Sequence, residues 1–96
     1  MVFMIKFTFL IRPDKASCFR IDPDRIAAGL FEMMSSVCQH MSRCSSGPAI
    51  QDGLAKIQVL AAAHGMRVKH WTDPKAKELR IEVTTKGGAC GSQTTD

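Results

Sequence analysis

The sequence lacks an apolar run long enough to span a bilayer, and no basic segment precedes its N-terminal apolar stretch. That stretch also contains Lys6, and its apolar residues alternate with others instead of running continuously. These features argue against a membrane span and against a secretory signal. We therefore predict a cytoplasmic protein without membrane contact, in which the four cysteines are reduced thiols.

Recognisable catalytic motifs are also missing. No glycine-rich phosphate loop follows an expected strand, and the carboxylates are few and lie mostly at helix starts and in loops. The spacing of the three histidines and four cysteines singles out no pair of nucleophile and base. We therefore predict that the protein is not an enzyme and uses no cofactor.

Cys38, His40 and Cys44 have the residue types of a zinc site. A structural zinc site needs four ligands in a tetrahedral array, and residues two apart on a helix point roughly 200° apart. Cys38 and His40 therefore cannot face one metal ion while the helix continues. Cys18 or Cys90 could supply further ligands, but neither belongs to a second Cys/His pair. We predict no bound metal and no obligatory disulfide.

What the sequence does contain is enough for one small domain. Its 96 residues allow a modest core without disulfide or metal staples. Six methionines and no tyrosine are typical of an adaptable core. A formal charge of +4 favours an anionic partner without requiring one.

The clearest structural signal is a strand over residues 2–12, where side chains alternate between two faces. One face carries Phe3, Ile5, Phe7, Phe9 and Ile11, and the other carries Met4, Lys6, Thr8, Leu10 and Arg12. Pro13 ends the strand because it cannot donate to a ladder. We predict that residues 15–21 form a connecting loop, from which Phe19 and Ile21 turn back towards the core.

Two amphipathic helices are expected next. Asp22, Pro23 and Asp24 are typical of a helix start, and apolar residues then recur at three- and four-residue steps over 23–43. We expect Gly29 to mark a close approach of the second helix, over 48–64. The buried face of that second helix is predicted to comprise Ile50, Leu54, Ile57, Leu60 and Ala61.

Residues 66–72 and 79–84 alternate again and are joined by a polar loop, which indicates a hairpin. The predicted fold is α+β, a two-layer sandwich in the order β-α-α-β-β, with a three-stranded sheet and two antiparallel helices on one face. The last strand could lie outside its hairpin partner or pair in parallel with the first strand. Residues 1–84 form a single domain, and 85–96 are expected to be a flexible tail.

The sheet face turned away from the helices holds the candidate partner-binding residues, which are Lys6, Arg12, Arg67, Lys69, Trp71 and Arg80. Five of them are cationic, against the carboxylate of Glu82. Cations that follow phosphates, with an aromatic ring for base stacking, are typical of open sheets that bind single-stranded nucleic acid. The alternative is a solvated outer face, on which Trp71 covers the stems of neighbouring lysines and arginines.

We therefore predict a small non-enzymatic binding protein that engages a macromolecular partner, nucleic acid or nucleoprotein, through its basic sheet face and hairpin. The alternative is a protein-binding inhibitor or adaptor of the type that phages and mobile elements encode, which blocks a surface on a larger host complex. A DNA-reading helix is disfavoured, because Lys56 is the only cation among the exposed positions of the second helix. Partner identity and strand order stay open, and an exposed strand edge or a methionine-rich helix surface could support a homodimer.

Overall fold

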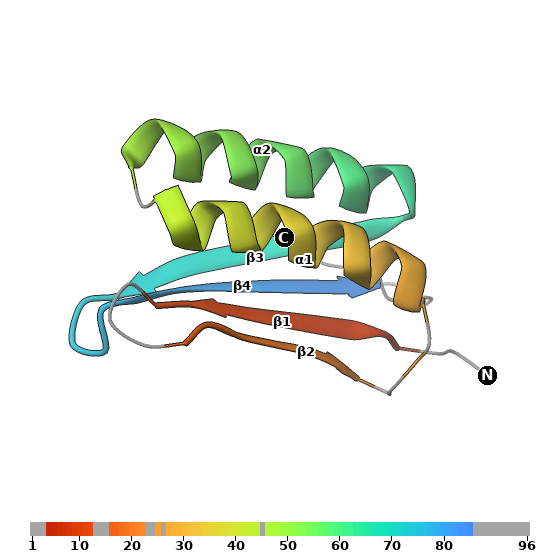
Figure 1. The fold of residues 1–96 in the computed structure, drawn as a ribbon. Coiled ribbons are helices and arrows are strands. Elements are labelled where there is room, and N and C mark those ends of the chain that lie inside the picture. The colour runs from red at the N-terminus through yellow and green to blue at the C-terminus, as the bar shows by residue number, and fades with distance from the viewer. Residues whose placement is uncertain (1–3, 13–15, 23–24, 26, 45, 86–96) are drawn as a thin grey trace.

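The structure is a computed structural model that describes residues 4–12, 16–22, 25, 27–44 and 46–85. Its elements are β1 (Lys6–Ile11), β2 (Cys18–Asp22), α1 (Ala28–Cys44), α2 (Gly47–Ala63), β3 (Met66–Asp73) and β4 (Glu78–Thr85). The strands form one antiparallel sheet in the order β2-β1-β4-β3. Figure 1 shows both helices on the same face of this sheet. The α+β class is therefore confirmed.

The prediction of three strands in the order β-α-α-β-β is wrong, because residues 15–21 do not form a loop throughout. Cys18–Asp22 is a strand that pairs with β1, with Phe19 opposite Phe9. The additional strand reverses the direction of every later element. As a result β4 runs antiparallel to β1 and lies between β1 and β3, neither outside its hairpin partner nor parallel to the first strand.

The expected start of α1 is also wrong. Asp22 is not a helix cap but the last residue of β2, opposite Lys6, and the helix begins only at Ala28. Arg25 and Ala27 have φ angles of 70° and 61°, a left-handed conformation that an α-helix cannot contain. Pro23 and Asp24 lie outside the described residues.

The later elements agree with the sequence to within one residue at each end. The side chain of Ser46 caps α2 by accepting a hydrogen bond of 3.2 Å from the backbone N–H of Ala49. Thr85, assigned to the tail, is instead the last residue of β4. The rest of the expected tail lies outside the described residues.

The core fills the space between the helices and the inner face of the sheet. Phe7, Phe9 and Ile11 of β1 are buried and Ile5 is half-buried, as predicted, whereas Phe3 is not described. The ring of Phe9 lies 5.5 Å from those of Phe19 and Phe31. The other buried hydrophobic residues of the described chain are Leu30, Met34, Cys38, Met41, Ile57, Ala61, Met66, Ile81 and Val83.

The helices approach each other closely at Gly53, and the prediction that Gly29 marks this approach is wrong. A Cβ atom added to Gly53 would overlap Cγ and Sδ of the buried Met41, whereas a Cβ atom on Gly29 would meet no atom within 4 Å. The missing side chain at Gly53 therefore makes room for Met41. Neither helix of the described chain is long and apolar enough to cross a membrane.

The strand order and the turn before β3 determine which parts of the sheet lie at its centre and which at its edges. The first and last strands in chain order, β1 and β4, lie together at its centre, and β2 and β3 form its edges. β3 follows directly after α2 through a turn at Gly65, which has a φ angle of 68°. From that turn β3 runs back beneath α2 towards the N-terminal end of the helix (Figure 1).

Candidate functional site: an open basic sheet face

The outer face of the sheet is the face opposite α1 and α2. Alternate residues of β1 and β4, such as Phe9 and Ile81, are buried against the helices, so their neighbours point to the other side. This register and the contacts below bring together the six predicted residues Lys6, Arg12, Arg67, Lys69, Trp71 and Arg80. The prediction of which side chains share this face is independent of strand order, since alternation along each strand decides it.

Part of the positive charge on this face is held in ion pairs with β4. Nζ of Lys6 lies 3.6 Å from Oε2 of Glu82, and Nε of Arg12 donates to Oε2 of Glu78 at 3.0 Å. Nη2 of Arg80 lies 3.8 Å from Oε1 of the same Glu78. The expectation of a single carboxylate is therefore incomplete. The side chains of Glu78 and Glu82 are only 11% and 20% exposed, whereas those of Lys6 and Arg80 keep 46% and 39%, so these two cations stay accessible from solvent while paired.

β3 presents the most accessible part of the face. Arg67, Lys69 and Trp71 are exposed, and Trp71 as a whole residue keeps 40% of its accessible surface. Trp71 is opposite Arg80, whose Cζ lies 5.7 Å from the centre of the indole ring, a cation–π arrangement. The ring is thus held at the sheet surface by its cross-strand neighbour.

Arg20 joins this face and was missed from the sequence. It lies opposite Thr8 on β2, and it contributes to a hollow of about 200 Å³ on the outer face. The hollow is lined by Lys6, Thr8, Leu10, Cys18, Arg20, Arg80 and Glu82. The alternation of Phe19 and Ile21 with Arg20 and Asp22 was the signal that could have placed it. We define the basic face as Lys6, Arg12, Arg20, Arg67, Lys69, Trp71 and Arg80.

No family model, curated protein or solved structure matches this chain. The function must therefore be inferred from the geometry of the chain itself.

The cysteine and histidine residues of α1 are arranged as the helical spacing predicts. Cys38 is buried while His40 is exposed, so their side chains do not share a face. Burial raises the pKa of the Cys38 thiol to about 12. Nε2 of His40 lies 3.6 Å from Sγ of Cys44, one turn later, and both are exposed. Within the described ranges no three His, Cys, Asp or Glu residues are grouped as metal ligands.

Proposed function

We propose that the protein binds single-stranded nucleic acid across its basic face. The observation that carries this proposal is the exposed ring of Trp71, on the same strand and side as Arg67 and Lys69. Bases of any sequence can stack on such a ring, with about 1–3 kcal/mol per base, while the cations hold the phosphates. The partner would then be recognised as a flexible polyanion with exposed bases.

The cations of β2, β1 and β4 extend the same surface towards the opposite edge of the sheet. Lys6, Arg20 and Arg80 surround the hollow on the outer face. With strands about 4.8 Å apart, the face spans roughly 14 Å from β2 to β3. A single strand crossing it would place one phosphate near the hollow and a base near Trp71. Phosphate groups can contact Lys6 and Arg80 from the solvent side, because both cationic side chains are partly exposed even while paired with the glutamates.

Intrinsic fluorescence provides a direct test. Trp71 is the only tryptophan and the chain contains no tyrosine, so the protein's emission reports on this face. We expect a single-stranded oligonucleotide to change the Trp71 emission in a saturable way, and a duplex of equal length to bind more weakly, because its bases are already stacked.

Charge reversal then distinguishes a specific face from general attraction. We expect Arg67→Glu with Lys69→Glu to weaken binding by at least about tenfold, since two phosphate contacts become repulsive. The matched control is Arg43→Glu with Lys56→Glu, which changes the net charge equally on the exposed surface of the helices. Equal losses in both variants would show that net charge alone attracts the oligonucleotide. Undiminished binding in the first variant would refute the proposal.

A protein partner is the second candidate function. It is favoured by a different observation, an apolar groove beside the outer edge of β3, an edge with which no strand of the described residues pairs.

A further inference from the structure

The backbone groups at the edge of β3 can be assigned from two hydrogen bonds elsewhere in the sheet. The N–H of Thr85 donates to the carbonyl of Ile5 at 3.1 Å, so odd-numbered residues of β4 direct their backbone groups towards β1. The N–H of Arg12 donates to Oγ of Ser17 at 3.2 Å, on the β2 side, which agrees with this alternation in β1. Even-numbered residues of β4 therefore bond to β3.

The partners of those residues in β3 are odd-numbered, since Arg67 is opposite Thr84 and Lys69 is opposite Glu82. The even-numbered residues of β3 consequently direct their N–H and C=O groups to the outer edge. These residues are Met66, Val68, His70 and Thr72, and in the described part of the chain no strand pairs with that edge.

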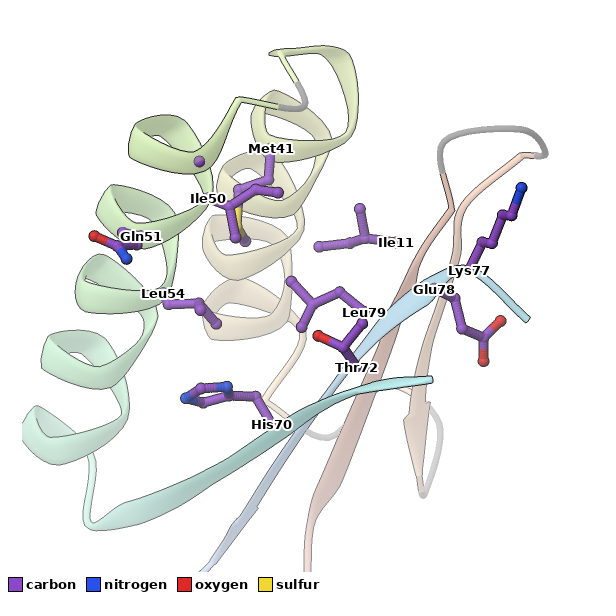
Figure 2. Close-up of a pocket in the computed structure, with 11 residues that line it drawn as sticks. Ile11, Met41, Ile50, Gln51, Leu54, His70, Thr72, Lys77, Glu78 and Leu79 are labelled. Carbon is purple, nitrogen blue, oxygen red and sulfur yellow. The ribbon is translucent and has the colours of Figure 1, made fainter. Parts of the chain in front are cut away.

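The side chains of the same even-numbered residues lie on the inner face, where a groove opens between β3 and α2. Figure 2 shows His70 and Thr72 of β3 facing Ile50 and Leu54 of α2 across this groove. Its volume is about 560 Å³, and Ile11, Met41 and Leu79 form much of its apolar lining. That volume is within the range of about 300–1,000 Å³ that is typical of ligand sites.

A strand added to this edge would therefore place side chains on both faces of the sheet. Residues paired with His70 and Thr72 would direct their side chains to the inner face, beside the groove, because opposite residues share a face. Residues between them would lie on the outer face, beside Lys69 and Trp71. Such strand addition takes its affinity from main-chain hydrogen bonds and its specificity from alternate side chains.

The charge of β3 selects the occupant. A second copy paired antiparallel along all four edge residues would bring Lys69 directly opposite Lys69 of the other copy, and like charges in that position are destabilising. Arg67 and Lys69 on the outer face, and Lys77 at the rim of the groove, instead favour carboxylates.

We propose that β3 and the groove bind an extended segment of a partner protein in which apolar and acidic residues alternate. The segment joins the sheet as an additional strand, with its apolar side chains towards the groove and its acidic side chains beside Arg67 and Lys69. This site shares Arg67 and Lys69 with the surface proposed for nucleic acid, but it also requires the strand edge and the groove on the inner face, which the nucleic acid would not contact.

The first test uses a fluorescent synthetic peptide in which glutamate alternates with valine and leucine. We expect saturable binding by fluorescence anisotropy, and binding at least about tenfold weaker when lysine replaces glutamate. By NMR, the amides of Val68, His70 and Thr72 should exchange rapidly in the free protein and become protected in the complex. The amides of Lys69 and Trp71, which bond to β4, should be protected in both states.

Two matched pairs of variants test the edge and the groove separately. His70→Pro removes an edge N–H and should weaken peptide binding by about tenfold relative to His70→Ala, which keeps it. Gln51→Phe fills the groove from the exposed side of α2, whereas Gln58→Phe is an exposed change on the same helix outside the groove. Only Gln51→Phe should weaken binding. Thermal melts establish that each variant is folded, and the Gln51/Gln58 pair decides the matter where His70→Pro lowers Tm.

The proposal is overturned if the glutamate and lysine peptides bind equally, or if Gln51→Phe and Gln58→Phe have equal effects. It is also overturned if the free protein is a dimer whose Val68 and His70 amides are already protected, since a second copy then occupies the edge. Oligonucleotide binding of the Gln51 and His70 variants should be unchanged, so that failure of this proposal and failure of nucleic-acid binding are recognised independently.

Discussion

At the scale of single residues, burial separates thiols that the sequence does not distinguish. Cys18 and Cys44 are exposed, whereas Cys38 lies on the inner side of α1 and is buried in the core. The raised pKa of Cys38, about 12, keeps this thiol protonated at mildly alkaline pH because its thiolate would be poorly solvated. The thiolate is the nucleophile, so a raised pKa lowers the reactivity of Cys38, and its burial lowers that reactivity further.

We therefore expect iodoacetamide at mildly alkaline pH to alkylate Cys18 and Cys44 in the folded protein and to leave Cys38 unmodified. Denaturant should expose Cys38 and make it react as well. Peptide mass mapping after a timed reaction measures each site separately. Alkylation of Cys38 in the native protein as fast as that of Cys18 would contradict the buried position of this thiol.

At the scale of the elements, the contact between α1 and α2 depends on one glycine. Gly53→Ala should lower the free energy of unfolding by about 1–3 kcal/mol, because the new methyl group overlaps Met41 in a packed core. Gly29→Ala is the matched control on α1. Its Cβ meets nothing within 4 Å, so the better helix propensity of alanine should stabilise the protein by up to about 1 kcal/mol.

Chemical denaturation of the two variants and the wild type measures both changes. Equal effects of the two substitutions would show that helix propensity alone is responsible. That outcome would contradict the close approach at Gly53.

How well each element could be predicted depends on the length and strength of its pattern. The alternation of β1 is long and Phe-rich, so Phe7 and Phe9 could be assigned to the core directly. β2 has only five residues and follows residue types at 13–14 that favour turns. Its short alternation is therefore a weaker signal than the turn, and the sequence predicts a loop there. The Asp-Pro-Asp signal at 22–24 is strong locally, yet pairing of Asp22 opposite Lys6 in the sheet overrides it.

The candidate site was predictable to the extent that it depends on alternation alone. Lys69, Trp71 and Arg80 could be placed on one face because each strand fixes its own two sides. Arg20 could not, because its strand was not recognised. The ion pairs of Glu78 could not either, because they depend on which strands become neighbours, and the sequence left that open.

At the scale of the whole molecule, the proposed nucleic-acid interface makes a quantitative prediction about salt. If about four cations of the basic face contact phosphates, the logarithm of the affinity should fall with the logarithm of salt concentration with a slope of about −3. Trp71 fluorescence titrations over a series of salt concentrations measure this slope. Arg67→Glu with Lys69→Glu should make it shallower, and a slope near zero in the wild type would exclude phosphate contacts as the source of affinity.

The central position of β1 and β4 determines when this chain can fold. Phe7 and Phe9 of the first strand lie beside Val83 and Ile81 of the last, so the middle of the sheet joins the most distant parts of the fold. Ordering the long intervening chain costs entropy before that pairing is rewarded. On the ribosome, β1, β2 and both helices are made before the strand that completes their shared core. The domain therefore acquires its native stability only after β4 has emerged. Until then the backbone edge of β1 that pairs with β4 has no partner strand.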